Sequence, residues 1–271
     1  MNKPIGIFDS GIGGLTVAHA ISKLLPNEQI VYFGDTAHLP YGDKSPALIH
    51  SFVKNISDFL LNKEHCKSVI IACNTASATS YEFLRDLHKG SYPIINVIDP
   101  IIEAIAKDDS LKKVGLIATK TTIESGVYQE KMKRRNPNIK MSALPTPLLA
   151  PMIEEGFSRD KISKTVIENY LSHPSFKHID SLILGCTHYV LIKDEINDYF
   201  NGHVKLFDST DLLALKLNKI LVKENLIAKS RLETNKFYVS DLTPSFEASA
   251  NRFYEENIEL IPINIGINQL N

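Results

Sequence analysis

Two short stretches of the chain are nearly alike, Ser68-Val69-Ile70-Ile71-Ala72-Cys73-Asn74-Thr75 and Ser181-Leu182-Ile183-Leu184-Gly185-Cys186-Thr187-His188. Each is an apolar run followed by a small residue, a cysteine and two polar residues. A run that is apolar at every position is typical of a strand in a parallel sheet with helices on both faces. Ligands bind such sheets at the carboxyl ends of the strands. Both cysteines are therefore predicted to lie at ligand-binding edges, one in each half of the chain.

Similar apolar runs alternate with segments of helical spacing along the rest of the chain. The predicted strands are 4–8, 29–33, 68–72, 94–98, 113–118, 141–144, 181–184, 204–207, 236–239 and 260–265. The predicted helices are 14–24, 47–62, 77–88, 100–107, 122–134, 160–171, 191–200, 210–225 and 245–255. Ser45, Asp160 and Thr243 are suitable N-cap residues for three of them. The alternation is typical of βαβ units and predicts an α/β fold with mostly parallel sheets.

Length and charge exclude several classes of protein. The chain has 271 residues, which suits two domains of roughly 100–200 residues each. Its 30 basic and 31 acidic residues give a formal net charge of −1, so no overall basic surface predicts binding to nucleic acid or anionic membranes. Its apolar runs fall well short of the ~20 residues that span a membrane. The N-terminal residues lack the apolar region of a secretory signal. We therefore expect a cytoplasmic protein with a small-molecule partner.

The chain has three cysteines, Cys66, Cys73 and Cys186, an odd number without C-x-x-C spacing. This pattern predicts reduced thiols and no cysteine-bound metal. A cysteine in an apolar strand is often only a small buried hydrophobe. However, the N-terminus of a following helix favours the thiolate, and thiols can then transfer protons. Their matching surroundings favour chemistry at Cys73 and Cys186, whereas Cys66 follows a polar stretch and has no predicted role.

Two loops add polar groups after the first two strands. Asp9-Ser10-Gly11-Ile12-Gly13-Gly14 places a carboxylate and a hydroxyl before a glycine-rich turn, where backbone N–H groups can approach an anion. Its spacing matches neither the dinucleotide-binding fingerprint nor the P-loop. The second loop runs from Gly34 to Gly42. Taken alone, the first loop is better explained as a tight strand-to-helix turn, and the proline and glycine of the second are also ordinary turn residues.

Taken together, these motifs resemble the bacterial glutamate racemase family. The resemblance rests on Asp9-Ser10-Gly11-x-Gly13-Gly14, Gly34-Asp35-Thr36 through Pro40-Tyr41-Gly42, Ala72-Cys73-Asn74-Thr75-Ala76 and Gly185-Cys186-Thr187-His188-Tyr189. The motifs occur in the family's order and span nearly the whole chain. One departure is Val190 after Tyr189, where the family often has proline.

The resemblance implies two doubly wound, flavodoxin-like α/β lobes with mostly parallel sheets, facing each other across a cleft. We place the first lobe at residues 1–97 plus 210–271 and the second at 98–209. The resemblance further implies a homodimer without pyridoxal phosphate, metal or other cofactor. Its activity would be the interconversion of L- and D-glutamate, which supplies D-glutamate for peptidoglycan synthesis.

The resemblance also implies roles for individual residues. Cys73 would deprotonate D-glutamate with help from Asp9, and Cys186 would deprotonate L-glutamate with help from His188 and Glu154. The neighbouring Glu155 is the alternative to Glu154. The implied substrate contacts are Asp9, Ser10, Tyr41, Gly42, Asn74, Thr75, Thr187 and His188.

Three other functions are consistent with parts of this pattern. An aspartate racemase would use the same two-cysteine logic on a shorter substrate. A hydrolase with Cys186 as nucleophile and His188 as base would need only one thiol. A non-catalytic α/β protein would bind an amino acid without exchanging its α-hydrogen.

Overall fold

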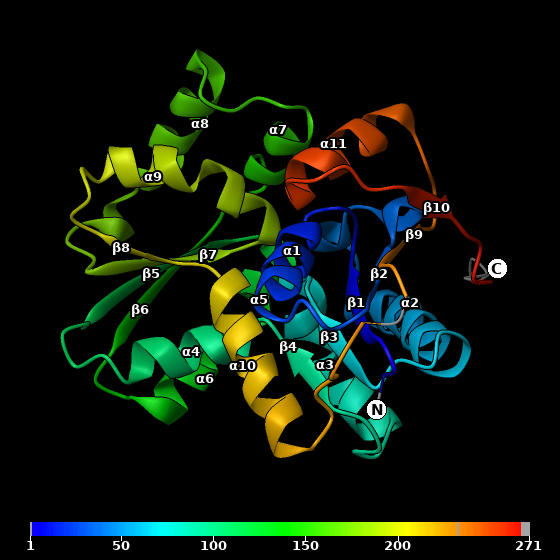
Figure 1. Ribbon diagram of the computed structural model, residues 1–271. Coiled ribbons are helices and arrows are strands. Elements are labelled where there is room, and N and C mark those ends of the chain that lie inside the picture. Colours follow the sequence, from blue (N-terminus) through cyan, green and yellow to red (C-terminus); the bar gives the residue numbers. More distant parts are fainter. Residues whose placement is uncertain (1, 232, 267–271) are drawn as a thin grey trace.

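The computed structural model describes residues 2–231 and 233–266, and its strands form two separate sheets (Figure 1). Within these residues, six strands form the larger sheet in the order β10-β9-β2-β1-β3-β4, and four form the smaller one in the order β6-β5-β7-β8. Every pair of neighbouring strands is parallel. The predicted α/β class is confirmed.

The strands lie close to their predicted positions. The larger sheet contains β1 (Ile5–Asp9), β2 (Ile30–Gly34), β3 (Ser68–Ile71), β4 (Ile94–Asn96), β9 (Lys236–Val239) and β10 (Leu260–Pro262). The smaller sheet contains β5 (Lys113–Ala118), β6 (Lys140–Pro145), β7 (Ser181–Gly185) and β8 (Lys205–Phe207).

Both sheets are wound in the same way. In β2-β1-β3-β4 and in β6-β5-β7-β8 the chain first adds a strand on one side of the starting strand and then moves to the other side. This doubly wound order creates a switch point between β1 and β3, and another between β5 and β7, where ligands bind such sheets. Cys73 and Cys186 follow β3 and β7, which are the third strands of their sheets. The two thiols thus occupy equivalent topological positions.

Helices and shorter helical turns connect the strands of both sheets. The α-helices are α1 (Leu15–Leu24), α2 (Pro46–Asp58), α3 (Asn74–Leu87), α4 (Ile98–Ala106), α5 (Lys120–Glu124), α6 (Val127–Arg135), α7 (Leu149–Glu154), α8 (Lys161–Leu171), α9 (Lys193–Tyr199), α10 (Thr210–Lys223) and α11 (Pro244–Tyr254). The shorter helical turns are η1 (Thr36–His38), η2 (Tyr41–Asp43), η3 (Phe59–Lys63), η4 (Pro174–Phe176) and η5 (Thr187–Ile192).

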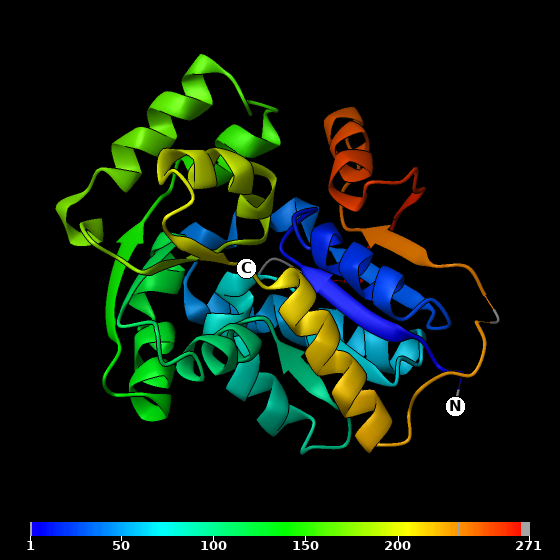
Figure 2. The same cartoon turned by 60° about the vertical axis from the view of Figure 1, so that its left-hand side comes forward.

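Alternating side chains of the strands build two cores. Ile5 and Ile7 of β1 pack into a core shared with α1 and α10, which also continues into the smaller sheet. Phe8, on the opposite face of β1, packs into a second core with α2 and α3. Successive strand residues point to opposite faces, so both faces of β1 are buried. Figure 2 shows α1 (blue) and α10 (yellow) side by side on the first of these faces.

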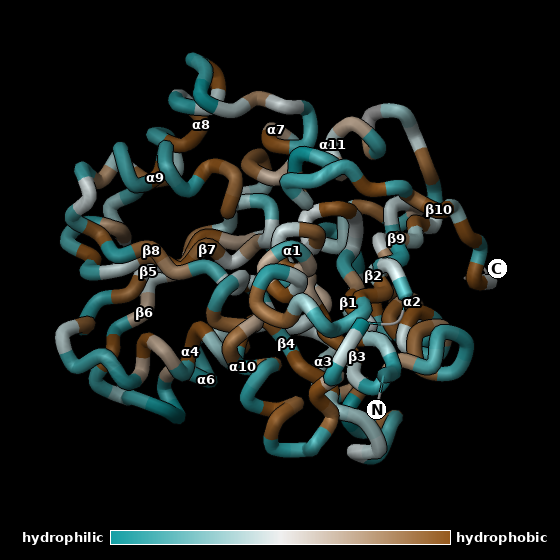
Figure 3. The backbone as a smooth tube through the Cα atoms, viewed as in Figure 1, coloured by the Kyte–Doolittle hydropathy of each residue, from teal (hydrophilic) through white to brown (hydrophobic). Residues whose placement is uncertain are grey.

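Hydropathy follows this arrangement. In Figure 3, hydrophobic segments lie along β7 and in the centre, whereas many of the outer turns are hydrophilic. Among the described residues, none of the helices has the length and apolar character needed to cross a membrane.

The predicted N-caps are confirmed by hydrogen bonds at the starts of α2, α8 and α11. The side chains of Ser45, Asp160 and Thr243 accept from the backbone N–H three residues later. At Asp160 the contact is reciprocal, because the Ser163 side chain also accepts from the Asp160 N–H.

Two predicted elements differ clearly from the structure, and one helix was not predicted. The helix expected over 122–134 is divided into α5 and α6 by Gly126, whose φ of +67° is left-handed and ends a right-handed helix. The strand expected over 94–98 stops at Asn96, because the side-chain oxygen of Asn96 accepts from the N–H groups of Ile98 and Asp99 and starts α4. Helix α7 was not predicted at all.

The predicted lobe boundaries at 97/98 and 209/210 stay a prediction. The strands of the larger sheet fall within 5–96 and 236–262, and those of the smaller sheet within 113–207. Helix α10 packs against both α1 and α4 and so connects the two parts.

Candidate active site

Cys73 is the N-cap residue of α3 and lies two residues after the end of β3. Its Sγ accepts from the Ala76 N–H at 3.4 Å and donates to Ser10 Oγ at 3.5 Å. The residue is only 5% exposed. Burial, reinforced by the negative charge of Asp9, raises the pKa of the Cys73 thiol to about 12. At neutral pH this thiol is therefore a proton donor, held next to a helix N-terminus that favours its anion.

Asp9 ends β1 and is completely buried. Its Oδ1 accepts from the Gly11 N–H at 2.9 Å, and its Oδ2 accepts from Thr187 Oγ1 at 3.4 Å. The second contact joins the larger sheet to the loop that follows β7. Burial raises the pKa of Asp9, while the charge of His188 and the Gly11 hydrogen bond oppose the shift. The carboxyl group is thus held where its negative charge is costly.

Cys186 begins a chain of polar contacts on the other side of the site. Its Sγ lies 3.5 Å from Nδ1 of His188, and Nε2 of that ring lies 2.8 Å from Oε1 of Glu154. Burial opposes protonation of His188, but Cys186 and Glu154 outweigh it and raise the His188 pKa well above its ordinary value. Phe253 packs edge-on against the imidazole. Glu155 is exposed, so Glu154 is the carboxylate that contacts His188.

Asn74 and Thr75, at the start of α3, are bound by side chains from the smaller sheet's half of the site. Tyr128 donates its hydroxyl hydrogen to Oδ1 of Asn74 at 2.6 Å. The Thr75 hydroxyl lies 2.9 Å from that of Thr119 and 3.2 Å from that of Thr122. The amide nitrogen of Asn74 is buried and has no hydrogen-bond partner. A buried donor of this kind is costly unless a ligand satisfies it.

The loop that contains Tyr41 and Gly42 is held from two directions. The Tyr41 hydroxyl donates to Oδ2 of Asp35 at 2.6 Å, and the other oxygen of Asp35 accepts from the Ser240 hydroxyl at 2.9 Å. The carbonyl of Gly42 accepts from Thr121 Oγ1 at 2.6 Å. Because the Tyr41 hydroxyl is already bonded, a ligand at this loop would meet backbone groups.

The structure thus brings the predicted residues from both sheets to one buried region. Cys186 is 8% exposed, and its neighbour Thr187 hydrogen-bonds to Asp9 at 3.4 Å, so the loop after β7 meets the end of β1. Thr119, Thr122 and Tyr128 also line this region but were not predicted from the sequence. Thr119 directly follows β5, at the switch point with β7, so the strand-end rule that singled out the cysteines could have found it.

Metal ligands are not gathered anywhere in the part of the chain that the structure describes. In residues 2–231 and 233–266, no group of three or more His, Cys, Asp or Glu side chains could hold a metal ion.

Gly13 supports the loop that carries Thr187 and His188. A Cβ at position 13 would lie 2.5 Å from Thr187 Oγ1 and 2.6 Å from the His188 ring. We expect Gly13→Ala to lower the free energy of unfolding by about 1–3 kcal/mol, the usual cost of overpacking. We also expect its enzymatic turnover to fall, because the loop must shift. Thermal unfolding and turnover measurements test both effects.

Gly90→Ala is the control for Gly13→Ala. A Cβ at Gly90 meets no atom within 4 Å, but the residue has a left-handed φ of +72°. This variant should lose about 1–2 kcal/mol of stability through its backbone alone and keep full turnover. Unchanged turnover in Gly13→Ala would show that the loop carrying Thr187 and His188 accommodates the added methyl group without shifting.

Known racemases are similar to this chain over nearly its whole length. The family model of the Asp/Glu/Hydantoin racemases matches residues 14–217. The glutamate racemase of Geobacter metallireducens is 39% identical over 252 residues, which cover 93% of this chain and 92% of that protein. The glutamate racemase of Neisseria meningitidis serogroup A is 38% identical over 260 residues, which cover 96% and 95%.

Solved structures of glutamate racemases are also similar to this chain. The crystal structure of glutamate racemase from Francisella tularensis in complex with D-glutamate matches with a TM-score of 0.91 and 38% identity, covering 98% of both chains. Glutamate racemase from Thermus thermophilus matches with a TM-score of 0.87 and 35% identity, covering 98% of this chain and 99% of that one. The chain therefore belongs to the Asp/Glu/Hydantoin racemase family and is a racemase enzyme.

Proposed function

We propose that this protein interconverts L- and D-glutamate by proton transfer at the α-carbon, with Cys73 and Cys186 as the two acid/base groups and no cofactor. One observation carries the proposal: two buried thiols lie at equivalent strand ends of two sheets, and Thr187, next to Cys186, hydrogen-bonds across to Asp9 at 3.4 Å. The names of the relatives support glutamate as the substrate, and one of them was solved with D-glutamate.

Inversion of a stereocentre without turning the substrate over requires a base on one face and an acid on the other. One sulfur must be thiolate while the other is thiol, and the direction of reaction exchanges these states. We assign deprotonation of D-glutamate to Cys73, assisted by Asp9, and deprotonation of L-glutamate to Cys186, assisted by His188 and Glu154. The chain of contacts from Cys186 through His188 to Glu154 supports the second assignment.

The raised pKa of Cys73 suits this chemistry. A strongly acidic thiol forms a weak base, which would abstract the weakly acidic α-proton poorly. The substrate brings its own α-ammonium group, and a positive charge close to the sulfur favours the thiolate when the substrate binds. Because both thiols are buried, we expect the loops of the two sheets to separate so that glutamate can enter.

Polar groups around the thiols match the charges of glutamate. The free amide nitrogen of Asn74 is a ready donor to a carboxylate. The other proposed contacts are the hydroxyls of Ser10, Thr75 and Thr187, the backbone at Tyr41 and Gly42, and the side chains of Asp9 and His188. Preorganised donors of this kind also stabilise the negative charge that develops as the α-proton leaves.

The cellular context is part of the same proposal. We propose that the enzyme works in the cytoplasm and supplies D-glutamate for peptidoglycan. We also propose a homodimer, since twofold pairs are the commonest oligomers. Light scattering at several protein concentrations tests the dimer directly.

Proton exchange in deuterium oxide tests the reaction. Purified enzyme without added pyridoxal phosphate is incubated separately with each enantiomer of glutamate and of aspartate. We expect deuterium in the inverted product from glutamate, with far slower reaction of aspartate. Faster reaction of aspartate would assign the shorter substrate, whereas folded protein without inversion or exchange of either amino acid would reject the proposal.

A further inference from the structure

Tyr128 reaches the catalytic region from a helix outside it. The residue lies in the first turn of α6, and its side chain is completely buried. Its hydroxyl donates to Oδ1 of Asn74 at 2.6 Å. Asn74 is the first helical residue of α3 and follows Cys73 directly. One hydrogen bond therefore connects α6 to the residue beside a proposed catalytic thiol.

This bond selects the orientation of the Asn74 amide. An amide group has an accepting oxygen at one end and a donating nitrogen at the other. Because the oxygen is bonded to Tyr128, the nitrogen faces away from the phenol, where it is buried without a partner. Without the phenol the amide could rotate and present its oxygen to an anionic substrate, which that oxygen would repel. The Asn74 N–H donor is therefore already oriented before a substrate binds.

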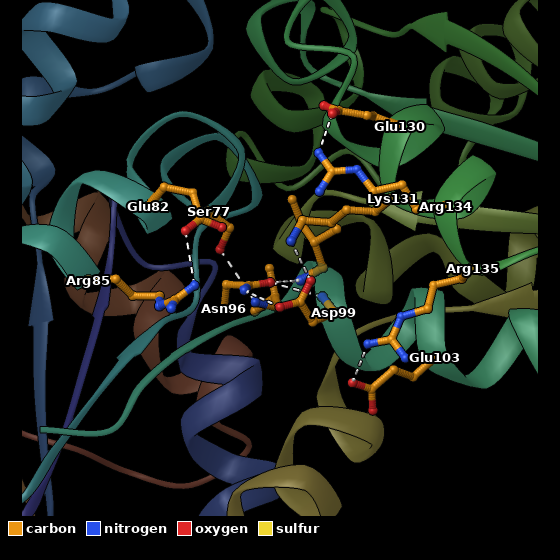
Figure 4. A network of polar contacts seen from close by, with 12 residues as sticks. Ser77, Glu82, Arg85, Asn96, Asp99, Glu103, Glu130, Lys131, Arg134 and Arg135 are labelled. Carbon is orange, nitrogen blue, oxygen red and sulfur yellow. Dashed lines mark hydrogen bonds and ion pairs between the residues drawn. The ribbon is translucent and has the colours of Figure 1, made fainter. Parts of the chain in front are cut away.

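Ion pairs connect helix α6 to α4 on its outer side (Figure 4). The Lys131 ammonium lies 2.7 Å from Oδ1 of Asp99, and Oδ2 of Asp99 accepts from the Asn96 amide at 2.8 Å. One turn further on, Arg135 pairs with Glu103 of α4 at 3.6 Å. Together with the packing of α6 on α4, these contacts set the position of Tyr128 relative to α4.

We propose that Tyr128 is a positioning residue for racemisation, which holds the Asn74 amide with its nitrogen turned toward a substrate carboxylate. This inference rests on the proposed function, because it assigns the substrate contact that Asn74 makes there. Tyr128 acts through Asn74 and touches no reacting atom. Burial raises the pKa of the Tyr128 phenol, so the hydroxyl remains a donor throughout the working pH range.

Tyr128→Phe removes the hydroxyl and keeps the buried ring. We expect kcat/KM for both glutamate enantiomers to fall about tenfold, the effect of roughly one lost hydrogen bond. Since the contact binds a carboxylate in the ground state as well as in the transition state, KM should rise by more than kcat falls. The matched control is Tyr254→Phe, because Tyr254 is also buried and its hydroxyl contacts Asn235 instead. This control should keep KM unchanged.

A double-mutant cycle with Asn74→Ala separates positioning from general support of the fold. If Tyr128 acts through Asn74, Tyr128→Phe should have no further effect on KM in the Asn74→Ala background. Additive effects, or a KM in Tyr128→Phe equal to that of wild type, would overturn the inference. Wild-type activity on glutamate is measured in the same series. Its absence would instead reject the proposed function, so the two failures are distinguishable.

Discussion

Cys73→Ser and Cys186→Ser are each expected to lower the racemisation of glutamate by about 10³-fold or more, within the usual range for loss of an acid/base group. Serine nearly preserves the size of the side chain, but its hydroxyl is a far weaker acid than a thiol. Each variant therefore lacks a proton carrier on one face of the substrate. Polarimetry or circular dichroism with each enantiomer measures the loss directly.

The two variants should differ in their residual proton exchange. Cys73→Ser keeps the base assigned to L-glutamate, so exchange of the α-hydrogen with deuterium oxide should be faster for L- than for D-glutamate. Cys186→Ser should show the opposite preference. Cys66→Ala is the matched control, because this third thiol is buried in the core that contains α2 and should leave turnover within about twofold. Full racemisation by either serine variant would contradict the two-base mechanism.

Asp9→Asn is expected to lower activity by about 10²-fold while making the protein more stable. Asparagine has nearly the same shape: its oxygen can still accept from the Gly11 N–H, and its amide nitrogen can instead donate to the Thr187 hydroxyl. It lacks the negative charge that raises the pKa of Cys73, so the pKa of that thiol should fall and its thiolate should become a weaker base. The pH dependence of Cys73 alkylation, measured in a variant that lacks the other two thiols, reports this shift.

The stability gain should depend on pH in a defined direction. Burial raises the pKa of Asp9 above its ordinary 3.8, so the folded protein holds this proton more tightly than the unfolded chain does. The protonated Asp9 carboxyl contributes its full stabilisation below pH 3.8, and this contribution is lost as the pH rises through the raised pKa of Asp9 in the folded protein. Asp9→Asn should therefore match wild type at acid pH and exceed it by about 0.5–2 kcal/mol at neutral pH.

Chemical denaturation between pH 4 and pH 8 measures this difference. Asp86→Asn replaces an exposed carboxylate on α3 and should change neither stability nor turnover appreciably. A neutral-pH stability of Asp9→Asn below that of wild type would show that the Asp9 carboxylate stabilises the fold and is not held there at a cost.

The fold could be predicted largely because most of its strands are rich in apolar residues and three of its helices begin with recognisable N-caps. Helix α7 escaped prediction because Pro145, Pro147 and Pro151 give its surroundings the composition of a loop. Pro151 is the third residue of α7, where no intrahelical N–H bond is lost. The break at Gly126 was also missed, since a glycine inside a helical pattern does not reveal its φ.

From the sequence, site residues could be predicted only where a reactive side chain lies at or just after the end of a strand. Cys73, Cys186 and Asp9 satisfy that rule, and motif resemblance added His188 and Glu154. Tyr128 could not be found in this way, because nothing local distinguishes it from any other helical tyrosine. Its contact with Asn74 arises only when α6 packs against α4 and the Tyr128 side chain reaches the start of α3. A tertiary contact of this kind leaves no periodic pattern in the sequence.

The unlike surroundings of the two thiols have a kinetic consequence. Cys73 lies beside Ser10 at a helix N-cap, whereas Cys186 is linked through His188 to Glu154. The two enantiomers of glutamate have equal free energies in water, so the Haldane relation requires equal kcat/KM in both directions. The asymmetry of the site can therefore appear only as a matched difference in kcat and KM, with the enantiomer that is held more tightly also turned over more slowly.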